Sequence, residues 1–388
     1  MLRKLLKKTP LAWLQLTREP TRLTIAIAGI AFADILIFFQ LGLTEGLFES
    51  VTKPYSALQG DLFLINPLFE SLAVVRSFPR ERLYQAAGAS GVKSINYLYI
   101  DQGRWRNPET KKNQSTMVFA INPSNSAMVL PEIQANLSQL SLLNRILYDR
   151  TGQSTLFGDI LGPLEQSGSV PIQFNNNQTK VVGTFTMGAS FTANGNIITS
   201  YSTLLKLFPD RQASQIDVGV ISLKPGTNIQ QVKLTIQAQL KDILVLTHEE
   251  FIEHEKKYWQ VNSPIGFLFG FGAVIGFVVG MVIVYQILYS DVSDHLSEYA
   301  TLKAMSYDDT YLMTVLIQES LVLAVFGFIP GFIVALGLYS IVTTVTFIPI
   351  LMNLNRALLV LSLTIVMCAG SGTIAMRKLK EADPADIF

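Results

Sequence analysis

Four long apolar stretches constrain this chain more than any other feature of its sequence. Each is long enough for the roughly 20 apolar residues that an α-helix needs to cross a bilayer core about 30 Å thick. They lie at residues 23–43, 258–290, 320–355 and 357–376. The first contains Asp34 and Gln40 as its strongly polar residues, and the other three carry no charge. The pattern predicts an α-helical membrane protein with four transmembrane helices and one large globular segment between the first two.

The limits of the expected segments follow from these stretches and from the charged residues around them. The first stretch has basic residues before it, but it is too long for the apolar part of a signal peptide and lacks a cleavage pattern, so we expect it to be retained. The transmembrane helices are expected at 23–43, 264–289, 311–342 and 356–376. The remaining segments are an N-terminal segment at 1–22, a large domain at 44–263, a loop at 290–310, a short loop at 343–355 and a tail at 377–388.

Basic residues predict the orientation in the membrane. Lysines and arginines are concentrated in residues 1–22 and again in 377–380. Because loops and ends rich in Lys and Arg stay on the cytoplasmic side, both termini are expected in the cytoplasm. The domain at 44–263 and the loop at 343–355 would then be periplasmic, and the loop at 290–310 cytoplasmic. Residues 1–22 also contain several leucines, which is typical of an amphipathic segment at the membrane interface.

The segment at 44–263 has the composition of an ordinary globular domain. Alternating or β-branched runs predict strands at 61–66, 92–100, 116–121, 180–185 and 215–223. Helices are predicted at 79–87, 131–148, 202–208 and 228–240. The mixture indicates an α+β domain.

Several classes of function are excluded by what the sequence lacks. The chain has 30 Lys and Arg against 29 Asp and Glu, so no basic field exists to attract nucleic acid. One cysteine and three histidines form no cluster at metal-ligand spacing. The phosphate-binding pattern GxxxxGK[ST] is absent, and so are GxSxG and HExxH. We therefore expect a non-catalytic subunit without a cofactor or metal of its own.

Two features of the apolar stretches point to helix contacts. Asp34 is costly in lipid, so it should face protein or a water-filled cavity. It is either a gating or substrate-path residue, or a packing hydrogen bond between helices or across a dimer. Gly272, Gly276 and Gly280 recur every four residues and predict a face to which another helix approaches closely.

The cytoplasmic loop is the most informative segment. Its charged residues fall at helical spacing with apolar residues between them, which predicts a short amphipathic helix suited to receive force from a partner protein. The residues expected to couple to that partner are Asp294, His295, Glu298, Leu302, Lys303 and Met305. Glu319 follows in the next helix, where its side chain is expected to reach the cytoplasmic interface or to cap the loop before it.

At this point the chain resembles a known family. The string Glu298-Tyr-Ala-Thr-Leu-Lys-Ala-Met-Ser-Tyr307, followed by Gln318-Glu319, is similar to the ExxxLKAxG…E pattern of the MacB/FtsX/LolC superfamily of ABC-transporter permeases. Ser306 departs from this pattern, in which glycine is usual. The basic tail that ends in Asp383-Pro384-Ala385 is also similar to the tail of that superfamily.

Further strings resemble the cyanobacterial DevC-type permease within this superfamily. They are distributed over nearly the whole chain. These strings are Gly60–Pro67, Arg106–Thr110, Gly188–Phe191, Gln215–Gly219, Ile283–Tyr289 and Asp383–Phe388.

The resemblance implies a fold, partners and a function. The fold would be that of a MacB-like (type VII) ABC permease, a homodimer in the inner membrane. A DevA-like ABC ATPase, which carries the ATP and Mg²⁺, would bind the cytoplasmic loop. The periplasmic domain would meet a DevB-like membrane-fusion protein and a TolC-like outer-membrane channel. Such relatives work by mechanotransmission, in which closure of the ATPases moves the periplasmic domain, here to export an envelope lipid or glycolipid.

Two other functions compete with export. An FtsX-like signalling permease would activate a periplasmic cell-wall hydrolase without transporting anything. A membrane enzyme is the third alternative, and the sequence offers it no nucleophile, base or metal constellation.

Overall fold

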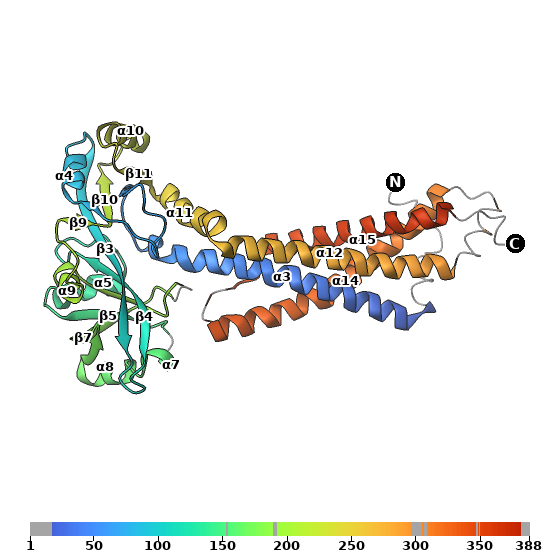
Figure 1. The fold of residues 1–388 in the computed structure, drawn as a ribbon, viewed down its shortest axis with the longest axis horizontal. Coiled ribbons are helices and arrows are strands. Elements are labelled where there is room, and N and C mark those ends of the chain that lie inside the picture. The colour runs from blue at the N-terminus through green and yellow to red at the C-terminus, as the bar shows by residue number, and fades with distance from the viewer. Residues whose placement is uncertain are drawn as a thin grey trace. The chain divides into compact units, whose positions relative to one another are not determined.

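The computed structural model describes residues 18–152, 154–188, 192–295, 301, 305, 309–346, 348 and 350–381. The chain divides into two compact units (Figure 1). The first unit, here called the helical unit, comprises the described residues within 1–45, 266–343 and 350–388. The second unit, here called the sheet unit, comprises those within 46–265 and 344–349.

Four long helices supply the helical unit. They are α3 (Pro20–Ser56), α12 (Pro264–Asp294), α14 (Asp309–Thr346) and α15 (Leu354–Glu381). By length and composition, each contains a segment able to cross a membrane. Their shared core contains Ile30, Val284, Leu323 and Met367, one from each helix. Helix α14 continues through Pro330 without interruption.

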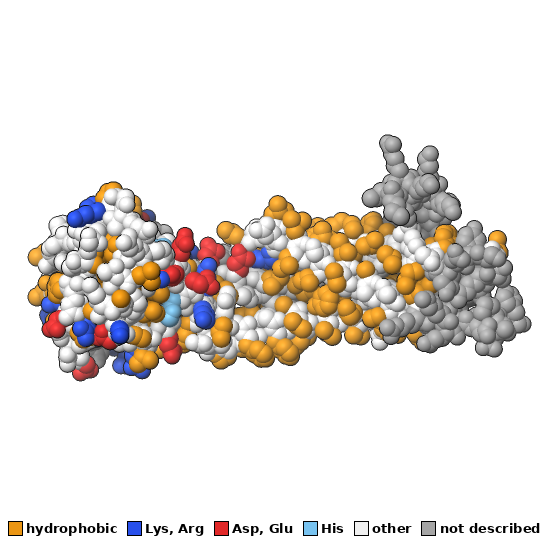
Figure 2. Space-filling model, turned by 90° about the horizontal axis from the view of Figure 1, so that it is seen from above, with side chains coloured by type: hydrophobic (Ala, Val, Ile, Leu, Met, Phe, Trp, Pro, Cys, Tyr) orange, Lys and Arg blue, Asp and Glu red, His pale blue; other side chains and the backbone are white. Residues whose placement is uncertain are grey.

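The outer faces of these helices are apolar. Large side chains such as Phe267 and Val274 of α12 and Ile333 of α14 are more than 55% exposed. In Figure 2 hydrophobic side chains cover much of the visible face of the helical unit. Exposed apolar surface of this extent marks an interaction surface, and on helices of this length it suits the interior of a bilayer.

The sheet unit is built on one nine-stranded mixed sheet. Its strand order is β11-β1-β10-β3-β4-β8-β5-β7-β6. The strands are β1 (Leu62–Ile65), β3 (Val92–Arg106), β4 (Asn113–Ile121), β5 (Arg145–Asp149), β6 (Val170–Phe174), β7 (Asn177–Phe185), β8 (Asn196–Ser200), β10 (Val218–Leu223) and β11 (Leu244–Thr247). A separate pair joins β2 (Phe78–Pro79) to β9 (Gln215–Ile216).

Strand β3 lies at the centre of the sheet's pairing because it is long enough to pair with two strands along its length. Its first half pairs with β10 and its second half with β4, while Trp105 and Arg106 also pair with β6. Alternate β3 residues point to opposite faces. Tyr99 accordingly lies in one apolar core, and Leu98 and Ile100 lie in the other.

Helices cover the sheet and complete its two cores. They are α4 (Glu81–Ala87), α5 (Pro131–Ala135), α6 (Leu137–Leu140), α7 (Ser154–Phe157), α8 (Leu161–Ser167), α9 (Tyr201–Leu207), α10 (Ile229–Gln239) and α11 (His248–Lys257), followed by a π-helical turn, η1 (Tyr258–Asn262). The α+β architecture that the sequence predicts is therefore confirmed.

One predicted helix is wrong. Residues 131–148 do not form a single helix, because α5 and α6 are short and Arg145–Asp149 forms β5 inside the sheet. Helix α6 already ends at Leu140, and Asn144, in a left-handed conformation with φ 62°, directly precedes the strand. The side chains of Ile146 and Leu147 then enter opposite cores, an alternation that a helix could not provide.

A buried carboxylate fixes α11 within the sheet unit. Glu255 accepts hydrogen bonds from the Tyr55 hydroxyl at 2.5 Å, the Leu72 amide at 2.9 Å and the Trp259 indole at 2.8 Å. Burial raises the pKa of Glu255 above its ordinary value, although the three hydrogen bonds act in the opposite direction. The carboxylate thus joins α11 to the C-terminal end of α3 and to the loop that carries Leu72.

Candidate functional site

Ion pairs connect the C-terminal end of α12 to the N-terminal end of α3. This end of α12 leads into the expected coupling segment at 290–310. The Arg22 guanidinium lies 3.4 Å from the Asp291 carboxylate and also forms an ion pair with Asp294. Glu19, one turn before Arg22, lies 3.1 Å from the same guanidinium. A cation at the start of one helix and two carboxylates at the end of another hold the two ends together.

His295 closes this cluster. Its ring nitrogen Nδ1 lies 3.0 Å from the backbone oxygen of Asp291 and 3.6 Å from the carboxylate of that residue. His295 is buried, whereas the side chain of Asp294 is 53% exposed. Asp294 and Glu19, whose side chain is 45% exposed, are therefore the carboxylates of the cluster that a partner protein can reach.

The structure describes only some of the other residues predicted to couple to a partner, and their role stays a prediction. Met305 is described and is 65% exposed, which suits an apolar contact with a partner. Glu298, Leu302 and Lys303 lie outside the described residues. So do Asp383 and Pro384 of the tail. The role of Arg22 was missed, because the basic residues of 1–22 were interpreted only as signals of orientation and of an amphipathic segment.

Glu319 of α14 is buried in the helical unit. Neither of its carboxylate oxygens has a hydrogen-bond partner in the described part of the chain. The expectation that its side chain reaches the interface is therefore wrong, whereas most of the loop that it was alternatively expected to cap lies outside the described residues. In the parts of the chain that the structure describes, Asp291 is the one other carboxyl group near enough to act on Glu319 electrostatically, so two carboxyl groups share this region of the helical unit.

Asp34 makes a packing hydrogen bond inside the chain. Its Oδ1 accepts from the Thr364 hydroxyl of α15 at 2.6 Å, and the residue is completely buried. A Cβ atom built on Gly331 of α14 would lie 3.0 Å from the Asp34 Cβ, so three helices meet at this point. Of the two roles that the sequence left open, the geometry favours helix packing.

A double-mutant cycle tests this role. We expect Asp34→Ala and Thr364→Val to show an interaction energy of about 0.6–1.7 kcal/mol, the range for hydrogen bonds between membrane helices. The measurement is the unfolding free energy of the full chain in detergent. Ser371→Ala provides the control, because its hydroxyl bonds instead to the Met281 backbone at 2.8 Å, so its effect should add to that of Asp34→Ala. Simple additivity of the Asp34 and Thr364 effects would contradict the packing role.

The glycines of α12 face other helices of the same chain. A Cβ on Gly272 would meet Gln40, and one on Gly276 would lie 3.3 Å from Leu36 and Ile37. These contacts are on α3. A Cβ on Gly280 would lie 2.6 Å from Ala33 of α3 and 2.3 Å from Met367 of α15. The ridge is occupied within the single chain, where it permits close helix approach.

The opposite end of the helical unit holds a second ion pair. Arg356, at the start of α15, pairs with Glu45 of α3, and Asn353 donates to the same carboxylate at 2.8 Å. The guanidinium lies 5.3 Å from the centre of the Tyr339 ring, and Arg356 is only 5% exposed. Sequence reasoning missed this pair. Its signal was available, since Arg356 is the one charged residue between 320 and 376.

A separate polar cluster lies in the sheet unit. Asp217 is completely buried and accepts from the Ile100 amide and the Ser77 hydroxyl, both at 2.7 Å. Arg211 forms an ion pair with Asp217, donates to the Ile100 backbone oxygen at 2.6 Å and lies 3.0 Å from the Asp101 carboxylate. Burial alone would lower the pKa of Arg211, but its hydrogen bonds to Asp217 and Asp101 raise it above the ordinary value.

The described residues contain no candidate metal-binding site. No group of three or more His, Cys, Asp or Glu side chains is placed there to hold a metal ion.

Comparison with known proteins identifies the C-terminal part of the chain. Residues 270–384 match the family model of the FtsX-like permease C-terminal domain. No curated protein sequence matches the chain. The chain is similar to the periplasmic region of MacB from Actinobacillus actinomycetemcomitans, with 13% identity, a TM-score of 0.35 and coverage of 50% of this chain and 92% of that one. It is also similar to the extracellular domain of the ABC-type transporter YknZ from Gram-positive bacteria, with 15% identity, a TM-score of 0.34 and coverage of 48% and 99%.

The family match begins inside α12 and extends through α14 and α15. It includes Asp291, Asp294 and Glu319, which the structure brings into one region of the helical unit. Residues 270–384 of the chain are therefore similar to the FtsX-like permease C-terminal domain.

Proposed function

We propose that the chain is the membrane subunit of an ABC-type machine and transmits the motion of a separate ATPase to the sheet unit. The observation that carries this proposal is the FtsX-like match over three of the four apolar helices. In this proposal the chain does no chemistry of its own, and the partner ATPase holds the ATP and Mg²⁺.

The geometry of the helical unit supports a route for that motion. The ATPase would bind the segment at 290–310, through Asp294, His295, Glu298, Leu302, Lys303 and Met305. The Arg22 cluster ties the beginning of this segment to the start of α3. Helix α3 continues without a break from Pro20 to Ser56, so one helix belongs to both units. A displacement at the end of α12 would thus act on α3.

The proposed setting is an inner membrane with both termini in the cytoplasm and the sheet unit in the periplasm. Two copies of the chain would form a homodimer with two DevA-like ATPases. The sheet unit would engage a DevB-like membrane-fusion protein and, through it, a TolC-like channel. The proposed cargo is an envelope lipid or glycolipid, as the resemblance to DevC-type permeases implies.

A signalling permease is the second candidate. The observation in favour of signalling is that the matched family domain is described as FtsX-like. In that case ATP-driven movement of the sheet unit would activate a periplasmic cell-wall hydrolase, and neither an adaptor nor a channel would be needed.

Affinity purification of the intact chain from its own membrane separates the two candidates. Mild detergent and mass spectrometry of the retained proteins are sufficient. Recovery of an ABC ATPase with a periplasmic adaptor is expected and supports export. An ATPase with a cell-wall hydrolase and no adaptor would support signalling, and the absence of any ATPase would contradict both candidates.

A second experiment tests the coupling segment directly. We expect Glu298→Ala combined with Leu302→Ala to lower retention of the ATPase about tenfold or more, because one charged and one apolar contact are removed. The measurement is quantitative mass spectrometry of the copurified ATPase at equal amounts of the permease. Glu249→Ala, which removes an exposed acid of the sheet unit, should leave retention unchanged. Normal retention by the double variant would place the ATPase contact elsewhere.

A further inference from the structure

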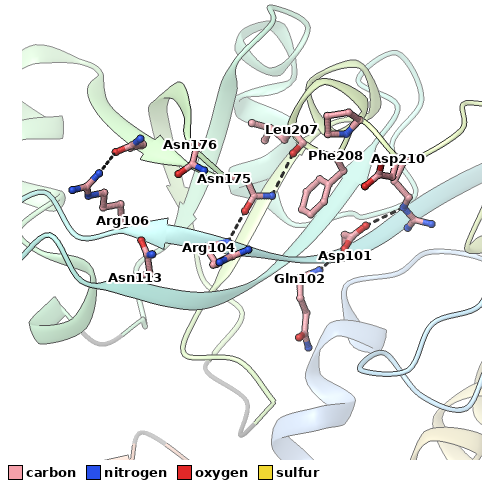
Figure 3. A pocket seen from close by; sticks show the side chains of 13 residues that line it. Asp101, Gln102, Arg104, Arg106, Asn113, Asn175, Asn176, Leu207, Phe208 and Asp210 are labelled. Carbon is pink, nitrogen blue, oxygen red and sulfur yellow. Dashed lines mark hydrogen bonds and ion pairs between the residues drawn. The ribbon is translucent and has the colours of Figure 1, made fainter.

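A polar groove in the sheet unit takes no part in the roles described above. It has a volume of about 500 Å³ and lies between strand β3, the turn that joins β6 to β7, and the loop after α9 (Figure 3). This volume is within the range of roughly 300–1,000 Å³ for sites that bind small organic ligands. Its lining is largely polar, in contrast to the apolar lining of most such sites.

Two arginines without an ion-pair partner line the groove, together with the carboxylates of Asp101 and Asp210. Arg104 and Arg106 are two residues apart on β3, so their side chains leave the same face of the strand, and both are exposed. Arg106 donates to the neutral amide of Gln173 at 3.0 Å. Neither guanidinium forms an ion pair within the described part of the chain. Their charges are therefore available to a ligand.

The wall opposite these arginines is held in place by hydrogen bonds. Asn175 and Asn176 form the two-residue turn between β6 and β7, with φ values of 45° and 63°. The side-chain oxygen of Asn175 accepts from the Arg104 backbone amide at 2.8 Å, and the Asn175 backbone amide donates to the Arg104 backbone oxygen at 3.0 Å. Figure 3 shows Asn175 between β3 and Leu207, whose backbone oxygen it also contacts. The groove is thus formed before any ligand arrives.

A second hollow lies beside the groove. It has a volume of about 260 Å³ and shares Asp101, Gln102 and Arg211 with the groove. At these shared residues the charge of Arg211 is opposed by two carboxylates, Asp101 and Asp217. The guanidinium groups of Arg104 and Arg106 are therefore the ones to which an acidic group of a ligand would bind, and the two hollows together have room for a ligand made of several units.

The chemistry of the lining identifies the class of ligand. Guanidinium groups bind carboxylates and phosphates through paired, charge-assisted hydrogen bonds. Side-chain amides, supplied here by Gln102, Asn113 and Asn176 among others, both donate and accept, which suits hydroxyl groups. The ring of Phe208 adds an apolar surface. We propose that the groove binds an acidic oligosaccharide, with an acidic group of the sugar at Arg104 and Arg106. This inference is independent of the proposed function.

Titration of the full chain with a defined oligosaccharide tests the proposal. The chain is purified in an uncharged detergent without a sugar headgroup, so that the detergent does not compete. Trigalacturonate is the acidic probe and maltotriose the neutral one, and calorimetry at low salt measures both. We expect the acidic probe to bind about tenfold or more tightly than the neutral one, and its binding to weaken as salt rises.

Matched variants locate the site. The double variant R104Q/R106Q should weaken trigalacturonate binding about tenfold or more, since it removes both charges while keeping polar side chains. Arg150→Gln is the control, because Arg150 is also exposed and also bonds to a neutral partner, Thr184 at 2.9 Å, outside the groove. The Arg150→Gln variant should bind trigalacturonate as tightly as the unmodified chain does.

Four results would overturn the proposal. Equal binding of the two oligosaccharides would remove the need for an acidic sugar, and unchanged binding by R104Q/R106Q would place any site elsewhere. Complete displacement by inorganic phosphate at the same concentration would indicate a site for small anions. A penta-aspartate peptide that binds as tightly as trigalacturonate would indicate an acidic protein partner instead.

Discussion

A Gly280→Leu variant is expected to lose the folded helical unit. A Cβ atom at this position would lie 2.3 Å from the sulfur of Met367 and 2.6 Å from the Cβ of Ala33. Both neighbours are completely buried, so neither can move into solvent. Overpacking of a filled core typically costs about 1–3 kcal/mol, and a leucine adds three further carbons beyond the Cβ atom that already clashes. Such a cost is a large part of the stability of an ordinary domain.

Gly270→Leu is the matched control for this prediction. It lies on the same helix, and a Cβ there would have no neighbour within 4 Å. Thermal unfolding in detergent, followed by the monodisperse fraction on size exclusion, should show an early loss for Gly280→Leu and a midpoint near that of the unmodified chain for Gly270→Leu. Equal midpoints for the two variants would mean that α12 does not pack against α3 and α15 as described.

The apolar helices could be predicted because their signal is local. Long uncharged runs need no knowledge of the rest of the chain, and all four were found. Their lengths were less predictable. Helix α3 continues to Ser56, beyond the apolar run that ends at Leu43, because glutamates such as Glu45 and Glu49 are good helix formers although they are not apolar.

The polar contacts could not be predicted because their partners are far apart in sequence. Arg22 and Asp294 are separated by 272 residues, and Arg356 and Glu45 by 311. A spacing rule covers only neighbours on one helix. The same is true of Gly272, Gly276 and Gly280. Their spacing predicts that another helix approaches closely, but it does not predict which helix that is. Strand β5 was misassigned for a related reason, because its place in the sheet depends on β7 and β8 and not on its own residues.

The polar and close-packing contacts of the helical unit are distributed along α3, from Arg22 to Glu45. Ion pairs join α3 to α12 at one end and α3 to α15 at the other. Between them, the glycines of α12 and the Asp34–Thr364 hydrogen bond bring α3 against its neighbours. Helix α3 takes part in each of these contacts. In the proposed machine it is therefore the helix through which movement of α12 would reach the rest of the unit.

The second large effect is expected in the sheet unit, at Arg211. Replacement by methionine leaves the buried carboxylate of Asp217 without its cation and removes a donor to the Ile100 backbone oxygen. Breaking a buried ion pair by removing one partner costs about 3–5 kcal/mol, because the remaining charge is left uncompensated. We expect Arg211→Met to destabilise the sheet around β3 and β10 by an amount in this range.

Hydrogen–deuterium exchange of the full chain measures this effect locally. Peptides from β3 and β10 should exchange faster in Arg211→Met, whereas peptides from α12 should not change. Arg104→Met is the control, because its exposed guanidinium has no ion-pair partner in the described part of the chain and its loss should leave exchange unaltered. Arg211→Lys should fall between the two, since lysine restores the charge but cannot reach Asp217, Asp101 and Ile100 at once. Normal protection of β3 and β10 in Arg211→Met would mean that Asp217 is held by its bonds to Ser77 and Ile100 alone.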